Sequence, residues 1–225
     1  ISMALGVKMP FDPQTAFKQV ATATSVPYVL VVNPSVSANT VQELIALVKK
    51  EPGKLRYGTA GPGTTQHLSG ELLNLRENIK LTAIPYKSSA QMTTDAIGGQ
   101  IEVMFHNAPV VLPHIKSGAL KPLAITSAAR SAAAPEVLIM AEAGVPDFEI
   151  TAWFGLMAPA GTPKPIIQKI SADVAKIIAM PEVRERILAQ ASVPISTTPE
   201  EYAAFIQSEI KKWSEVVKLA NMQAD

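Results

Sequence analysis

The amino-acid sequence predicts an α/β fold. Short runs rich in β-forming residues alternate with amphipathic helical patterns through the middle of the chain, and this repetition is typical of a mostly parallel sheet covered by helices on both faces. Glycine-containing signals end the predicted helices, as at Glu51-Pro52-Gly53, Gly98-Gly99 and Ser117-Gly118. We therefore expect crossover connections between the strands of this region.

The predicted elements follow one another from residue 29 to residue 126. Strands are expected at residues 29–32, 55–58, 80–84, 101–105 and 122–126, with helices at 40–50, 65–75, 90–97 and 110–116. After Gly161-Thr162-Pro163 the pattern changes to helices, at 166–179, 181–190 and 199–220. Because few strands remain there to support them, we expect these helices to cover a sheet completed by residues outside this chain. Packing on the middle sheet is the alternative.

Composition and charge exclude several classes of protein. Twenty basic and nineteen acidic residues give a formal net charge of +1, and no basic stripe suggests a nucleic-acid partner. The longest apolar run, near residues 28–32, is far shorter than the roughly 20 residues of a membrane-spanning helix, so we expect no direct membrane insertion. Cysteine is absent, and His67, His106 and His114 do not have metal-binding spacing. We expect neither a metal nor another cofactor.

A glycine-rich turn between a predicted strand and a predicted helix carries the clearest functional signal. Thr59, Ala60, Gly61 and Gly63 follow the strand at 55–58, and Thr64 and Thr65 open the next helix. The first backbone N–H groups of a helix lack intrahelical partners and carry the positive end of its dipole, so they favour anions. The threonine hydroxyls add further donors. The alternative is an ordinary turn with a threonine N-cap.

Two further junctions have the same order of strand, polar residues and helix. Lys87, Ser88 and Ser89 follow the strand at 80–84, while His106 and Asn107 follow the strand at 101–105. The carboxyl ends of parallel strands gather at one edge of a sheet, so we expect the junctions to line one crevice. For the third junction the alternative is a plain loop with a surface or hydrogen-bonded histidine.

Catalytic residues are not apparent in the sequence. His67 and Ser69 lie two positions apart on one helix and face different directions, and no G-x-S-x-G turn is present. A receptor needs only hydrogen-bond donors, whereas an enzyme also needs a base that reaches its substrate. We therefore expect a non-enzymatic binding protein. The alternatives are a small acyl or phosphoryl transferase that uses the glycine-rich loop for an anionic substrate, and a structural interaction module.

The whole chain resembles the tripartite tricarboxylate transporter receptor family, also known as the Bug proteins. The resemblance rests on many short motifs in the right order. They include Tyr57-Gly58-Thr59-Ala60-Gly61-Pro62-Gly63-Thr64, Pro85-Tyr86-Lys87, Gly98-Gly99-Gln100, Pro113-His114-Ile115-Lys116-Ser117-Gly118, Trp153-Phe154-Gly155-Leu156 and Ala158-Pro159-Ala160-Gly161-Thr162-Pro163.

This resemblance implies a type II periplasmic binding protein, in which two lobes with mostly parallel sheets hold a solute between them. Residues 1–28 would be a remnant of the first lobe, residues 29–154 the second lobe, and residues 155–225 the C-terminal helical part of the first lobe. The first lobe would be incomplete, because family members have an N-terminal segment before Ile1. The implied function is a periplasmic receptor that delivers a small carboxylate to the membrane components of a tripartite transporter, and the chain start shows no signal peptide.

The resemblance also implies the positions of the ligand contacts. The implied second-lobe contacts are Thr59, Ala60, Gly61, Gly63, Thr64, Thr65 and His67, with Lys87, Ser88 and Ser89 nearby. His106 and Asn107, at the third junction, are further expected ligand-binding residues. Family members commonly have Asp before Asn107, where this chain has His106. Imidazole is a poorer partner than carboxylate for a ligand ammonium group. We therefore expect a dicarboxylate or aromatic carboxylate to bind better than aspartate or glutamate.

Overall fold

The computed structural model describes residue 5 and residues 8–222. Its helices and strands follow the predicted order. The elements are β1 (Phe17–Val32), α1 (Val41–Lys50), β2 (Arg56–Thr59), α2 (Thr65–Glu77), β3 (Thr82–Pro85), α3 (Ser89–Ile97), β4 (Val103–Asn107), α4 (Ala108–Lys116), β5 (Lys121–Ile125), β6 (Thr151–Pro159), α5 (Lys164–Ala179), α6 (Pro181–Ala189), β7 (Val193–Pro194) and α7 (Pro199–Leu219). The ends of the predicted first and last segments, residues 1–4, 6–7 and 223–225, lie outside the described residues.

The central sheet has the strand order β3-β2-β4-β1-β5. β2 is parallel to β3 and β4, whereas β1 is antiparallel to β4 and β5. β2, β3, β4 and β5 therefore run in one direction and β1 runs in the other. The sheet is mixed but mostly parallel, as predicted, and the carboxyl ends of β2, β3 and β4 lie at the same edge.

Helices cover both faces of this sheet, because its strands alternate side chains between two apolar clusters. On β4, Phe105 belongs to a cluster with Leu68 and Leu72 of α2, while Met104 belongs to a second cluster with Met92 of α3. Both Phe105 and Met104 are fully buried. The alternation fixes the direction in which each residue at the end of a strand points.

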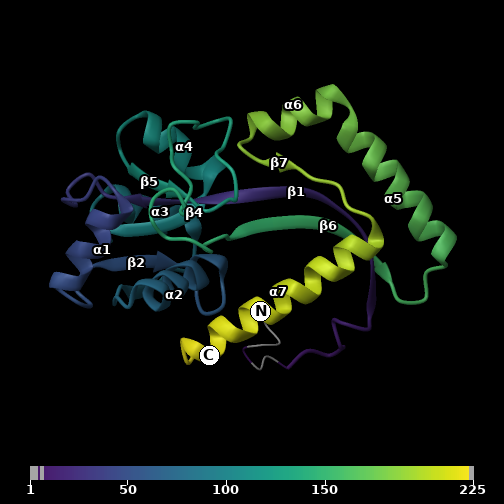
Figure 1. The fold of residues 1–225 in the computed structure, drawn as a ribbon, viewed down its shortest axis with the longest axis horizontal. Helices are drawn as coiled ribbons and strands as arrows, with labels where there is room; N and C mark the ends of the chain where they lie inside the picture. The colour runs from purple at the N-terminus through teal and green to yellow at the C-terminus, as the bar shows by residue number, and fades with distance from the viewer. Residues whose placement is uncertain (1–4, 6–7, 223–225) are drawn as a thin grey trace.

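A long two-stranded ribbon extends from the sheet. The first part of β1 pairs with β6 in antiparallel register from Phe17–Pro159 to Pro27–Thr151, and the last part of β1 lies between β4 and β5. β7 pairs with β1 at Thr24 and Ser25. Figure 1 shows β1 and β6 crossing the molecule side by side, with α1 to α4 at one end and α5 and α6 at the other.

The three C-terminal helices differ in how they pack. Trp213, Val216 and Val217 of α7 are buried in the same cluster as Phe105, so this end of α7 packs on the middle sheet, which was the less favoured alternative. α5 buries Ile167 in a small cluster with Val20 and Ala158, and α6 buries no residue. Within the described part of the chain, no helix combines the length and the apolar character needed to cross a lipid bilayer.

Candidate functional site

The glycine-rich turn after β2 is held by its own polar groups. The backbone N–H of Gly61 donates to Thr59 Oγ1 at 3.1 Å, and the Thr64 hydroxyl donates to the Gly61 carbonyl at 2.7 Å. The backbone N–H of Gly63 donates to His67 Nδ1 at 3.4 Å. Gly61 and Gly63 have φ values of +103° and +71°, a conformation that favours glycine. Ala60 is exposed at the tip of the turn. Thr59, Thr64 and His67 thus shape the turn.

The N-terminus of α2 is left uncapped by this arrangement. Thr64 occupies the N-cap position, but its side chain makes no capping hydrogen bond and turns back to Gly61 instead. The first backbone N–H groups of α2 therefore keep their capacity to bind an acceptor. Thr65, the first residue of α2, is only partly buried and adds a hydroxyl at the same place.

A second uncapped helix N-terminus lies beside the first. Asn107 is the N-cap residue of α4, and its side chain also makes no capping hydrogen bond. Tyr28 of β1 pairs with Asn107 in the sheet, and the side chains of Thr65 and Asn107 lie near its phenol. Burial raises the pKa of the Tyr28 phenol, although the nearby Thr65 and Asn107 side chains oppose the rise. The phenol is therefore neutral near pH 7, and it lies close to both helix ends.

The predicted second junction lies at the same edge but further from Tyr28. It follows β3, which is the outermost strand on this side of the sheet. Ser88 caps α3 by accepting a hydrogen bond from the backbone N–H of Gln91 at 3.2 Å. Lys87, Ser88 and Ser89 are all exposed. Their contact with a ligand stays a prediction.

His106 differs from the expected crevice residue, because it is buried in the sheet. Its residue is 3% exposed, and neither ring nitrogen has a hydrogen-bond partner among the described residues. Burial lowers its pKa to about 4, so the ring is neutral near pH 7. Its strand neighbours Phe105 and Asn107 point to the opposite face. A role for His106 in selectivity stays a prediction.

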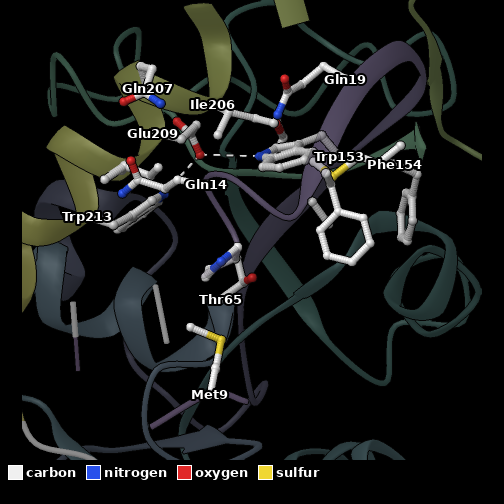
Figure 2. Close-up of a pocket in the computed structure, with 16 residues that line it drawn as sticks. Met9, Gln14, Gln19, Thr65, Trp153, Phe154, Ile206, Gln207, Glu209 and Trp213 are labelled. Atoms are coloured by element: carbon white, nitrogen blue, oxygen red, sulfur yellow. Dashed lines mark hydrogen bonds between the residues drawn. The ribbon is translucent and has the colours of Figure 1, made fainter. Parts of the chain in front are cut away.

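A cavity of about 540 Å³ opens beside Thr65. Figure 2 shows its walls, which come from the segment at residues 9–19, from β6 and from α7. Trp153 and Trp213 both donate their indole N–H to Glu209 Oε2, at 3.3 and 2.9 Å. Sequence analysis did not find this cavity. The sequence signal for it was the spacing of Glu209 and Trp213, which lie four residues apart and therefore on one face of a helix.

The comparison with protein families identifies one family model, described as tripartite tricarboxylate transporter family receptor, which matches residues 4–222. Protein BugT of Bordetella pertussis is 35% identical over 218 residues, which are 97% of this chain and 67% of BugT. The chain spans between 63% and 67% of the length of BugT and three other curated relatives.

Solved structures agree with the sequence relatives. The structure of R. palustris Rpa4515 with adipate has a TM-score of 0.86 and 32% identity, and the match covers 96% of this chain and 72% of Rpa4515. MatC (Rpa3494) from Rhodopseudomonas palustris with bound malate has a TM-score of 0.81 and 28% identity, with 96% and 74% coverage. The predicted fold class and the predicted receptor family, rather than an enzyme family, are confirmed.

Proposed function

The chain belongs to the tripartite tricarboxylate transporter receptor family, and we propose that it is a periplasmic receptor that captures a small carboxylate for a transporter of this type. The coarse assignment to solute-binding receptors follows from family membership. The proposal adds the carboxylate ligand, the periplasmic location and the membrane components of the transporter as partners. The bound adipate of Rpa4515 and the bound malate of MatC support the ligand class.

The observation that carries the proposal is the pair of uncapped helix N-termini at Thr64 and Asn107. Elsewhere the chain uses polar N-caps for capping: Thr40 caps α1, Ser88 caps α3 and Thr198 caps α7. α5 and α6 begin after Pro163 and Met180, which have no such side chain to offer. Only at the ends of β2 and β4, within the described residues, does a capable N-cap side chain leave its helix uncapped.

A carboxylate at this place would accept hydrogen bonds that the protein does not make for itself. Backbone N–H groups of the first turn of α2 and the Thr65 hydroxyl are suitable donors, and the helix dipole favours the negative charge. A hydrogen bond to a charged group contributes about 1.5 to 3 kcal/mol.

Calorimetric titration of this chain with adipate, malate and succinate tests the proposal. We expect at least one of these acids to bind, and Thr65→Val to weaken its binding by about tenfold or more, because the substitution removes a hydroxyl donor and keeps the side-chain shape. Thr94→Val is the matched control, since Thr94 is an exposed helical threonine of α3. Absence of binding to every carboxylate, or equal losses in the two variants, would contradict the proposal.

A further inference from the structure

The cavity beside Thr65 has walls that are mainly apolar. Thr65 lies at one side of it, and the rings of Trp153, Phe154 and Trp213 contribute to the rest (Figure 2). Its remaining apolar wall is formed by Met9, Pro13, Phe17, Ala152, Met157, Ile206 and Ile210. Cavities of a few hundred Å³ with apolar walls and few polar groups are typical sites for small organic ligands.

Glu209 is the one charged side chain among the described residues that line this cavity. Its Oε2 atom accepts both indole N–H groups, and its Oε1 atom lies 3.6 Å from Lys212 Nζ. Lys212 also donates to the Glu149 carbonyl and lies over the Trp213 ring, 4.9 Å from its centroid. Lys212 is therefore held by these contacts and is not part of the cavity lining.

These contacts restrict which groups a ligand can place in the cavity. A second carboxylate would meet Glu209 and no cationic side chain of the lining, and two like charges placed close together repel each other. An ammonium group would compete with two indole N–H groups for Glu209 Oε2. An apolar body meets neither obstacle, and an aromatic ring can pack edge-to-face or offset on the tryptophan rings.

We propose that this cavity holds the apolar, preferably aromatic, body of a monocarboxylate whose carboxylate group lies at Thr65. The inference rests on the proposed function, because it takes the N-terminus of α2 as the site of the carboxylate. It adds the ligand class: an arylalkanoate is preferred over a short dicarboxylate and over an aromatic amino acid. Trp153, Phe154 and Trp213 are the residues that determine this preference.

Intrinsic fluorescence provides a direct test, because the two tryptophans of the chain both line the cavity. The protein is titrated with 3-phenylpropionate, succinate and phenylalanine. We expect saturable changes in tryptophan emission, with a Kd for 3-phenylpropionate that is at least about tenfold lower than for the other two ligands. Tighter binding of succinate would show that a second carboxylate finds a partner, and tighter binding of phenylalanine would show that Glu209 binds an ammonium group. Either result overturns the inference.

Two substitutions on β6 separate the cavity from the rest of the strand. Phe154→Ala removes an exposed ring of the lining, whereas Leu156→Ala removes an exposed side chain outside the lining. We expect Phe154→Ala to weaken 3-phenylpropionate binding by about fivefold or more, and Leu156→Ala to leave it unchanged. Equal effects would overturn the inference. If the acids bind with equal affinity but Thr65→Val weakens the binding of each one, only the cavity assignment fails. If no carboxylate binds, the proposed function fails as well.

Discussion

The two ends of the ribbon differ sharply in how they bury apolar side chains. We call residues 33–150 the sheet half and residues 151–198 the ribbon half; both share β1. The sheet half exposes only three large apolar side chains among the described residues, those of Leu75, Val110 and Leu138. The shorter ribbon half exposes Phe154, Leu156, Met157, Ile166, Ile170, Ile177, Met180, Leu188 and Val193. Similar apolar content therefore gives a core in one half and an open surface in the other.

The difference shows what each half depends on. Two layers of helices enclose the sheet half and place side chains on both faces of every strand. In the ribbon half, β6 pairs with no described strand other than β1, and α6 buries no residue. β6 and β7 are hydrogen-bonded to β1, whereas α5 buries only Ile167, Ser171 and Ile178. We expect substitutions in the ribbon half to lower the free energy of unfolding less than substitutions in the sheet half. We also expect the backbone of the ribbon half to open locally more readily.

A matched pair of phenylalanine substitutions should show the largest difference. Phe105 is fully buried and stacks on Phe148, whereas Phe154 is 56% exposed. We expect Phe105→Ala to lower the free energy of unfolding by about 3 to 5 kcal/mol and Phe154→Ala by less than about 0.5 kcal/mol. Urea denaturation followed by circular dichroism gives both values. Similar losses would mean that the ribbon half has a core of its own.

Acid should destabilise the sheet half through His106. The pKa of His106 falls from 6.5 in the unfolded chain to about 4 in the folded protein, so the unfolded state binds the proton more strongly. The stability contributed by the neutral ring is complete above pH 6.5 and declines as the pH falls towards 4, by about 2 to 3 kcal/mol at pH 4.5. We expect His106→Leu to lose correspondingly less stability than the parent between pH 7 and pH 4.5 in urea denaturation. An identical pH dependence would contradict the prediction.

Hydrogen exchange should resolve the comparison helix by helix. We expect amides of α5 and α6 to exchange at least about tenfold faster than those of α2 and α3, because their helices bury few side chains. The C-terminal half of α7 should be protected like α2, since Trp213 and Val217 belong to the larger core. Mass spectrometry of peptides from a dilute, monomeric sample provides the measurement. Uniform protection of the three C-terminal helices would remove the distinction between the halves.

Sequence periodicity located the elements of the sheet half to within a few residues, because apolar alternation and glycine signals agree there. It missed the first part of β1, residues 17–28. In this part Gln19, Thr22, Thr24 and Ser25 interrupt the apolar pattern, and the strand is specified by its pairing with β6. Pairing between distant segments has no local signal.

The candidate site also has a part that the sequence predicts and a part that it does not. Thr59 to Thr65 were predictable because a strand, a glycine-rich turn and a helix follow one another directly in the sequence. Tyr28 was not, since only the sheet register brings it to Asn107. His106 was predicted to follow a strand, whereas it lies within β4 and is buried, because the direction of its side chain depends on which face of the sheet it occupies. The cavity joins Thr65, Trp153 and Glu209, which lie far apart in the sequence.

The continuity of β1 determines where the protein can be divided for use as a split reporter. A cut within residues 17–32 would break the strand that pairs with β4, β5, β6 and β7, so neither fragment would keep a complete set of backbone partners. The turn at residues 160–163, between β6 and α5, lies outside every strand and helix. A cut there would leave β1 and β6 together on one fragment, and the α5–α7 fragment would have to find its place by docking on a preformed ribbon.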